Sequence, residues 1–120
     1  MARSILDEAS IHPGARERIA NYHLATVKEV QAAVAANDVV VVGMRMNPFP
    51  AKARKLLGEA RIAYKYLEYG SYLGEWRRRL AIKLWTGWPT FPQVFVKGVL
   101  IGGAAELEKL IQSGEVARKA

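Results

Sequence analysis

Short apolar runs rich in β-branched or aromatic residues predict four β-strands after residue 38. The run VVVVG over 39–43 is continuously apolar, which is typical of a strand buried on both faces. The run IAYKYLEY over 62–69 alternates in polarity and is rich in aromatic residues, as expected of a strand. The last two runs, 93–96 and 99–101, flank Lys97-Gly98. Because this two-residue turn holds a glycine that tolerates positive φ, the two runs predict a β-hairpin.

Elsewhere the apolar residues recur every three or four positions, which predicts four amphipathic helices. The first helix would begin at a capping box formed by Thr26 and Glu29 and end at the polar residues of AAND, 35–38. Its apolar residues are Val27, Val30 and Val34. The other stripes are Ala53, Leu56, Leu57 and Ala60; Leu73, Trp76, Leu80 and Leu84; and Leu107, Leu110 and Ile111, with Gly114 as the final C-cap.

The element order after residue 38 is therefore β-α-β-α-β-β-α. A right-handed crossover makes the first two strands parallel, and the closing hairpin adds two antiparallel strands. The sequence thus predicts an α/β fold with a four-stranded mixed sheet between helices. Residues 1–25 are polar and irregular, with a short helix over 15–23, and we interpret them as an N-terminal extension to one domain over 26–120.

Composition limits the function classes. The chain has 120 residues, of which 51% are hydrophobic, so a core can form, but no apolar run approaches the roughly 18 residues of a membrane span. The N-terminus lacks the pattern of a signal peptide, so we expect a cytoplasmic protein without a membrane partner. His12 and His23 have no carboxylates at ligand spacing, so no metal site is expected.

Charge and cysteine content narrow the chemistry further. The net charge is +7, which favours acidic partners, and the densest basic cluster is Arg77–Arg79. That cluster fits either a solvated helix face or an anion or nucleic-acid site, although no single-strand-binding motif accompanies it. The chain has no cysteine, which excludes disulfides, thiolate ligands and a cysteine nucleophile supplied by these residues.

Two stretches resemble the glutaredoxins, a family with the thioredoxin fold. WPTFPQVFVKGVLIGGAAELEKLIQSGE, 88–115, is similar to the monothiol-class pattern of a WPT-x-P-Q segment, a hairpin and a GG-C-D turn. VVVVGMRMNPFPAKARKLL, 39–57, occupies the place of the first strand, the active-site loop and the first helix. The resemblance covers 39–115 and implies the thioredoxin/glutaredoxin fold for the predicted sheet.

The resemblance places Asn47 where glutaredoxins carry the nucleophilic cysteine. Pro50 stands where the second cysteine, or the serine of the monothiol motif, would be. Thiol-disulfide exchange needs a thiolate that attacks sulfur, and an asparagine amide cannot do this. The resemblance therefore implies vacant catalytic positions, no autonomous catalysis and no thiolate ligand for an iron–sulfur cluster. Asn and Pro together favour a naturally cysteine-free relative over an engineered one.

The resemblance also implies a glutathione groove. Pro92 matches the family's cis-proline, which would expose the backbone of Phe91 to the cysteinyl part of glutathione. Arg79 matches a basic position that meets the glycine carboxylate in monothiol relatives. The remaining positions implied to bind the ligand are Arg45 beside the loop, and Gly103, Ala104, Ala105 and Glu106 at the last helix, where backbone N–H groups would bind the γ-glutamyl carboxylate.

This pattern departs from the family at two residues, and its loop also lacks the monothiol insertion. Ala105 replaces the aspartate that receives the ligand's α-amino group, with Glu106 one position later as the substitute. Met44 replaces the basic residue before the loop, with Arg45 adjacent to it. We therefore expect weak glutathione affinity.

Three hypotheses remain open from the sequence. The first is a non-catalytic module that binds glutathione or a protein segment in the groove. The second is a glutaredoxin-type oxidoreductase in cell redox homeostasis that depends on a thiol supplied by a partner. The third is an anion- or nucleic-acid-binding protein that uses Arg77–Arg79.

Overall fold

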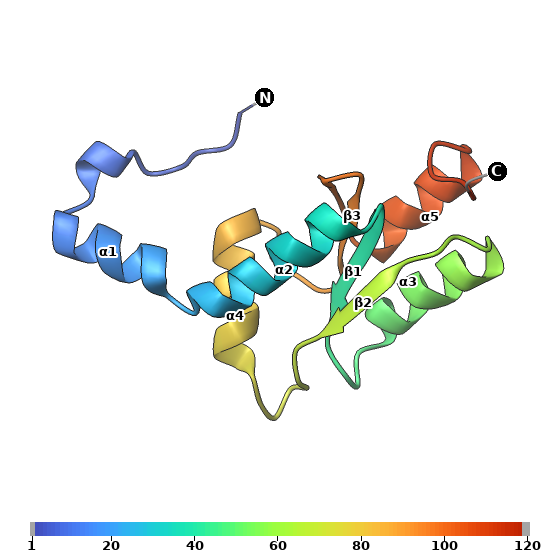
Figure 1. The fold of residues 1–120 in the computed structure, drawn as a ribbon, viewed down its shortest axis with the longest axis horizontal. Coiled ribbons are helices and arrows are strands. Elements are labelled where there is room, and N and C mark those ends of the chain that lie inside the picture. Colours follow the sequence, from blue (N-terminus) through green and yellow to red (C-terminus); the bar gives the residue numbers. More distant parts are fainter. Residues whose placement is uncertain (1, 119–120) are drawn as a thin grey trace.

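The computed structural model describes residues 2–118 and shows a single sheet enclosed by helices (Figure 1). The strands are β1 (Val39–Gly43), β2 (Lys65–Glu68), β3 (Gln93–Val96) and β4 (Val99–Gly102). The helices are α1 (Pro13–Asn21), α2 (Leu24–Ala36), α3 (Pro48–Glu59), α4 (Trp76–Thr86) and α5 (Ala104–Gln112), with a short 3-10 helix at Glu8–Ser10. The predicted order of elements after residue 38 is confirmed.

The sheet has the strand order β2-β1-β3-β4, with β1 parallel to β2 and antiparallel to β3. The predicted mixed sheet is therefore confirmed. The hairpin between β3 and β4 is also confirmed, because Lys97 and Gly98 both have positive φ, 50° and 81°, as a two-residue type I′ turn requires. The strand predicted over 62–69 is shorter in the structure, covering only Lys65–Glu68.

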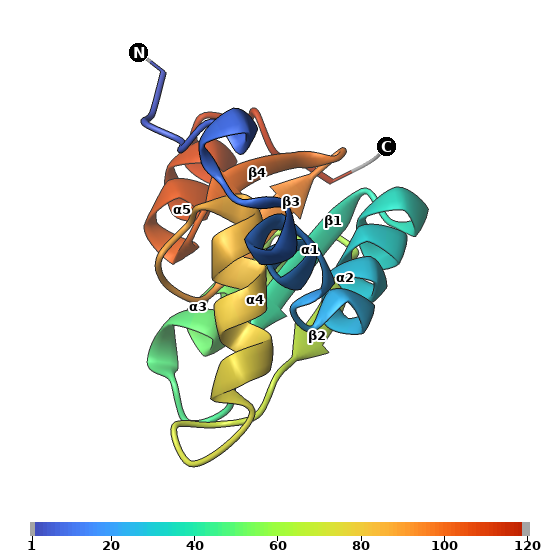
Figure 2. The same ribbon diagram turned by 90° about the vertical axis from the view of Figure 1, so that its left-hand side faces the viewer.

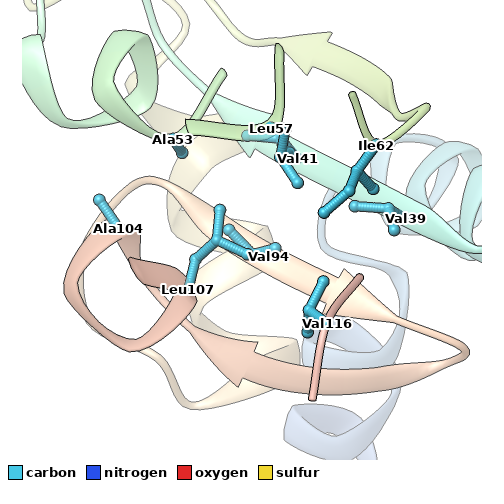
Figure 3. Packing of buried hydrophobic residues seen from close by; sticks show 9 residues of the cluster. All are labelled: Val39, Val41, Ala53, Leu57, Ile62, Val94, Ala104, Leu107 and Val116. Atoms are coloured by element: carbon cyan, nitrogen blue, oxygen red, sulfur yellow. The ribbon is translucent and has the colours of Figure 1, made fainter. Parts of the chain in front are cut away.

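The valines of β1 divide the core into two layers because successive side chains of a strand point to opposite faces. Val39 and Val41 pack with Leu57 of α3 and Leu107 of α5 on one face (Figure 3). The core on the opposite face is formed by Val30, Val40, Val42, Met44, Tyr69, Ile82, Phe91 and Phe95. Helices α2 and α4 cover this second face (Figure 2), so β1 is buried on both sides as predicted.

The start of α2 differs from its prediction. The predicted capping box at Thr26 and Glu29 is wrong, because the helix begins at Leu24 with His23 as N-cap in a left-handed conformation, φ 44°. Thr26 lies inside the helix, where its Oγ1 accepts a hydrogen bond of 2.9 Å from Arg78 Nε. The contact with α4 therefore uses the hydroxyl that the capping box would have needed.

The inward face of α4 also differs from its prediction. The stripe taken as the buried face is largely exposed: Leu73 is 93%, Trp76 53% and Leu84 64% accessible. The buried residues are instead Arg79, Ala81 and Ile82. A basic side chain of α4 thus lies inward and large apolar side chains lie outward.

The N-terminal extension contacts the domain sparsely. Neither the 3-10 helix nor α1 contains a buried residue, and α1 projects away from the sheet (Figure 1). Arg3 Nη1 donates a 3.0 Å hydrogen bond to the carbonyl of Thr86 at the end of α4. The short helix predicted over 15–23 starts earlier, at Pro13, because His12 Nδ1 accepts from the Gly14 amide as an N-cap. None of the helices within residues 2–118 has the length and hydropathy of a bilayer-spanning segment.

Candidate functional site

Asn47 is the N-cap of α3, directly after the loop that leaves β1. Its Oδ1 accepts a 2.9 Å hydrogen bond from the Phe49 amide, and Pro48 occupies the first helical position. The NPFP residues, 47–50, are thus the cap and first turn of α3. Position 47 therefore faces the positive end of a helix dipole, the geometry that activates a thiol where one is present.

Gly43 allows Pro50 to pack against the end of β1. A Cβ at Gly43 would lie 2.7 Å from Pro50 Cβ and 3.0 Å from the Tyr66 hydroxyl, so no larger residue fits without movement. Pro50 is fully buried in this contact. Pro50, predicted as the second vacant catalytic position, is therefore a packing residue that turns away from solvent.

A groove of about 350 Å³ runs beside Asn47 on the side of α4. Phe91 forms part of its wall, and the Phe91-Pro92 peptide bond is cis, as predicted. The groove is lined by Met44, Asn47, Phe49, Tyr72, Arg79, Lys83, Pro89, Thr90 and Phe91. The lining contains two cationic side chains and no carboxylate, so the groove is electropositive.

Arg79 is the central charge of the groove. It is only 7% exposed, and its Nη1 donates to the carbonyls of Tyr69 and Gly74, at 2.9 and 2.6 Å. Among the residues that the structure describes, no carboxylate forms an ion pair with it. A buried guanidinium without a counter-ion is costly, and an anionic ligand in the groove would offset that cost.

The three arginines of the basic cluster have separate environments. Arg77 is exposed and lies over the Trp76 ring, 4.5 Å from its centroid. Arg78 is bound to Thr26, Glu29 and Glu75, with ion-pair distances of 3.7 Å and 3.2 Å to the two glutamates. Since Arg78 is neutralised and Arg79 is buried, the cluster does not present three free cations on one surface.

The start of α5 lies next to Pro92 but outside the groove lining. A Cβ at Gly103 would lie 3.4 Å from the Pro92 carbonyl, and the amides of Ala104 and Ala105 begin the helix. Glu106 Oε1 accepts a 2.9 Å hydrogen bond from the Gly103 amide. Glu106, predicted to receive a ligand's amino group, is thus engaged as a helix cap.

Arg45 does not line the groove either. Its Nε lies 3.7 Å from Glu68 Oε2, and its side chain is 66% exposed. The structure therefore brings Asn47, Arg79 and Phe91 together around the groove and leaves Arg45 to one side. Their roles in ligand binding stay predictions.

Sequence reasoning did not single out Lys83, Tyr72 or Thr90, which also line the groove. The position of Lys83 could have been predicted from the sequence, because Lys83 follows Arg79 by four residues on a predicted helix and so lies on the same helix face. Tyr72 and Thr90 lie on loops, and no periodicity indicates where loop side chains point.

A larger cavity of about 620 Å³ lies at the other end of the sheet. It is lined by Ala36, Asn37, Asp38, Val39, Ile62, Ala63, Tyr64, Val96, Lys97, Glu115, Val116, Ala117 and Arg118. Two acidic and two basic side chains lie around its apolar residues, so it carries no net preference for an anion. None of the predicted site residues belongs to it.

Metal ligation finds no support in the described part of the chain, residues 2–118, where no cluster of three His, Cys, Asp or Glu side chains could hold an ion. The Asn47 amide cannot replace a thiolate as an iron–sulfur ligand, so the residues at the vacant position do not fit such a cluster.

Removing the cap at Asn47 should destabilise α3 without altering the core. We expect Asn47→Ala to lower the free energy of unfolding by about 0.5–2 kcal/mol, because the Phe49 amide loses its acceptor. Urea unfolding would measure this loss. Asn47→Asp is the matched control and should retain the stability, since its carboxylate accepts the same hydrogen bond and favours the helix N-terminus. Equal losses in both variants would contradict the capping role.

Tyr66, which packs against Gly43 near the vacant position, provides a pH-dependent prediction. Burial, followed by its hydrogen bond to Glu68, raises the pKa of Tyr66 to about 12. The unfolded chain, with a tyrosine pKa of about 10, loses this proton first, so the free energy of unfolding should fall as pH rises from about 10 to about 12. Urea unfolding at pH 9 and pH 11 should show a smaller fall for Tyr66→Phe than for the wild type. An unchanged fall would mean that Tyr66 does not contribute.

Comparisons with known proteins agree on one family. The family model described as Glutaredoxin matches residues 39–101. A glutaredoxin-like protein of Dictyostelium discoideum is 51% identical over 96 residues, covering 80% of this chain and 78% of that protein. The mitochondrial glutaredoxin-2 of Homo sapiens is 30% identical over 101 residues, and the match spans 80% of this chain but 58% of the human protein.

Solved structures agree with the fold. Oxidised glutaredoxin 2 of Chlamydomonas reinhardtii superposes with a TM-score of 0.65 at 26% identity, covering 76% of this chain and 86% of that one. A buckwheat glutaredoxin–glutathione complex superposes with a TM-score of 0.68 at 23% identity, covering 82% of this chain and 86% of that one. At that identity the second structure supports the fold alone.

Proposed function

This chain belongs to the glutaredoxin family, and we propose that it is a non-catalytic member whose groove binds glutathione. Three features around position 47 support this proposal: a helix N-terminus, a groove wall that ends at a cis-proline, and cationic side chains in the groove lining. Position 47 holds an asparagine, so the groove has no thiol sulfur. Binding without thiol chemistry is the function that these features support best.

Arg79 is the observation that carries this proposal. A guanidinium that is 7% exposed, holds two backbone carbonyls and lacks a carboxylate partner among the described residues is suited to bind an anion from the groove. Lys83, which also lines the groove, adds a second positive charge at its edge. The glycine carboxylate of glutathione has the charge and size for this position.

Catalysis by the chain alone is not part of the proposal. Thiol-disulfide exchange forms a mixed disulfide between a thiolate and the substrate sulfur, and position 47 holds an amide that cannot form that bond. The pyrrolidine of Pro50 offers no second thiol. We expect glutathione to bind reversibly without being chemically altered.

A comparison of glutathione with its glycine carboxamide tests the proposal. Calorimetric titration should give a dissociation constant about 10- to 150-fold weaker for the carboxamide, because a hydrogen-bonded charged group contributes about 1.5–3 kcal/mol. The glycine methyl ester of glutathione is a second analogue without the glycine carboxylate charge and should behave like the carboxamide. Equal binding of all three, or none by glutathione at millimolar concentration, would contradict a carboxylate site.

A further inference from the structure

Five exposed apolar side chains of residues 46–76 belong to the groove lining or lie within three residues of it in the sequence. They form what we call the collar: Met46, Phe49, Tyr72, Leu73 and Trp76, with exposed fractions of 77%, 58%, 66%, 93% and 53%. Isolated exposed apolar residues are normal on a protein surface, but a group beside a groove marks a contact surface. The collar includes Leu73 and Trp76, two of the four residues that the helical pattern predicted to be buried.

Backbone hydrogen bonds hold the two loops of the collar together. The Arg45 amide donates 2.6 Å to the Gly70 carbonyl, and the Tyr69 amide donates 3.0 Å to the Gly43 carbonyl. These bonds join the loop before α3, which carries Met46, to the loop before α4, which carries Leu73. Phe49 and Tyr72 also line the groove. The collar therefore shares two residues with the groove.

Glutathione leaves most of the collar unused. Its apolar groups are only methylenes, whereas the collar presents a phenylalanine, a tyrosine, a tryptophan, a leucine and a methionine side chain. Large aromatic side chains and methionine are typical of the centres of protein-binding surfaces. A ligand that covers the collar must carry apolar side chains of its own.

The positive charge of the groove lining indicates that this ligand carries an anionic group. The groove lining contains Arg79 and Lys83 but no acid, and Arg77 stacks on the Trp76 ring at the collar. The glycine end of glutathione is chemically the C-terminus of a peptide. A protein C-terminus presents the same carboxylate and adds apolar side chains a few residues upstream.

We propose that the groove and collar together bind the free C-terminal segment of a partner protein. The terminal carboxylate lies at Arg79 and Lys83, and apolar side chains of the preceding residues pack on Leu73, Tyr72 and Trp76. This inference rests on the proposed function, because both ligands use the same carboxylate site. It differs from that function in requiring the collar.

The test uses two pools of eight-residue peptides, randomised at their last four positions, one with free C-termini and one amidated. Both pools are passed over immobilised full-length chain, and the retained peptides are identified by mass spectrometry. The free pool should be retained at least several-fold better, with apolar residues enriched among the last four positions. Equal retention of the two pools, or no retention of either, would overturn the proposal.

Variants separate the collar from the carboxylate site. The double variant Leu73→Ser and Trp76→Ser should weaken the best retained peptide by about tenfold, since each replaces an apolar contact, and should leave glutathione binding unchanged. Leu84→Ser is the matched control: Leu84 is an exposed leucine of α4, at 64%, but it lies eight residues after Trp76 and outside the collar, so the change should alter neither affinity.

The outcomes distinguish the two proposals. Glutathione binding together with an unaffected double variant would overturn the collar and leave the proposed function intact. If the wild-type chain binds neither glutathione nor peptide, both proposals are overturned. Binding of anionic phosphatidylserine vesicles that depends on Leu73 and Trp76, without peptide retention, would assign the collar to a membrane surface and overturn the peptide proposal.

Discussion

Replacing Asn47 by cysteine is expected to create a reactive thiol in a chain that has none. The new side chain would stand at the N-terminus of α3, where the helix dipole and the free amides stabilise a thiolate. Its pKa should therefore fall below the ordinary value of about 8.5. The pH dependence of alkylation by iodoacetamide measures this pKa. Glutathione-dependent reduction of a mixed disulfide should rise from the uncatalysed rate to a measurable turnover.

A control cysteine isolates the effect of position. Ser113 lies at the opposite end of a helix, as the C-cap of α5, where the dipole disfavours a thiolate. Ser113→Cys should keep an ordinary or raised pKa and show no turnover. If the two cysteines titrate alike, position 47 does not have the environment of an active site.

Replacing Arg79 by glutamine should remove most of the groove's affinity for glutathione. The expected loss is roughly 10- to 150-fold, corresponding to about 1.5–3 kcal/mol for hydrogen bonds to a charged group. Arg77→Gln is the control, because Arg77 is exposed on Trp76 and outside the groove lining, and it should do little. Calorimetric titration measures both variants.

Arg79 also holds two carbonyls at the β2–α4 connection, so its variant needs a structural check. A thermal melt should show a folded protein with reduced stability, and Lys83→Gln, whose side chain makes no such bonds, should weaken binding to a smaller extent. Equal losses for Arg77→Gln and Arg79→Gln, with a steep dependence on salt, would indicate diffuse electrostatics instead of a defined site.

The β-strands were predictable because their signals are local. Four consecutive valines before a glycine specify a strand buried on both faces, and Lys97-Gly98 specifies a tight hairpin. Their order then leaves few topologies open, because crossover connections are right-handed. The resemblance to the glutaredoxins added the cis-proline, which no periodicity indicates.

The predictions for the start of α2 and for the buried face of α4 were wrong because a tertiary contact overrides the local sequence pattern there. The hydroxyl of Thr26 accepts from Arg78 across a helix interface, and no sequence rule at the start of α2 includes that partner. In α4 the inward position is occupied by Arg79, whose guanidinium donates hydrogen bonds to backbone carbonyls of the loop that precedes the helix. Apolar periodicity assigned the opposite face to the core.

The same reasoning explains what the sequence revealed of the site. Asn47 and Phe91 could be placed from the resemblance because each lies in a recognisable motif, and Arg79 could be placed because it matches a basic helical position of monothiol relatives. The state of Glu106 could not, since the motif does not say whether its carboxylate is free or caps Gly103. The collar was hidden for a related reason: its residues resemble core residues until the structure shows them exposed.

The most direct test of a surviving glutathione site is a titration of the isotopically labelled chain with reduced glutathione, followed through the backbone amide resonances. If the groove binds glutathione, chemical-shift changes should be confined to the groove and its neighbours. The largest are expected at the amides of Phe91, Arg79, Ala104 and Ala105. Amides of the hairpin turn at Lys97-Gly98, at the other end of the sheet, should remain in place. Unchanged spectra at millimolar glutathione, or shifts spread evenly over the basic surface, would contradict glutathione binding in the groove.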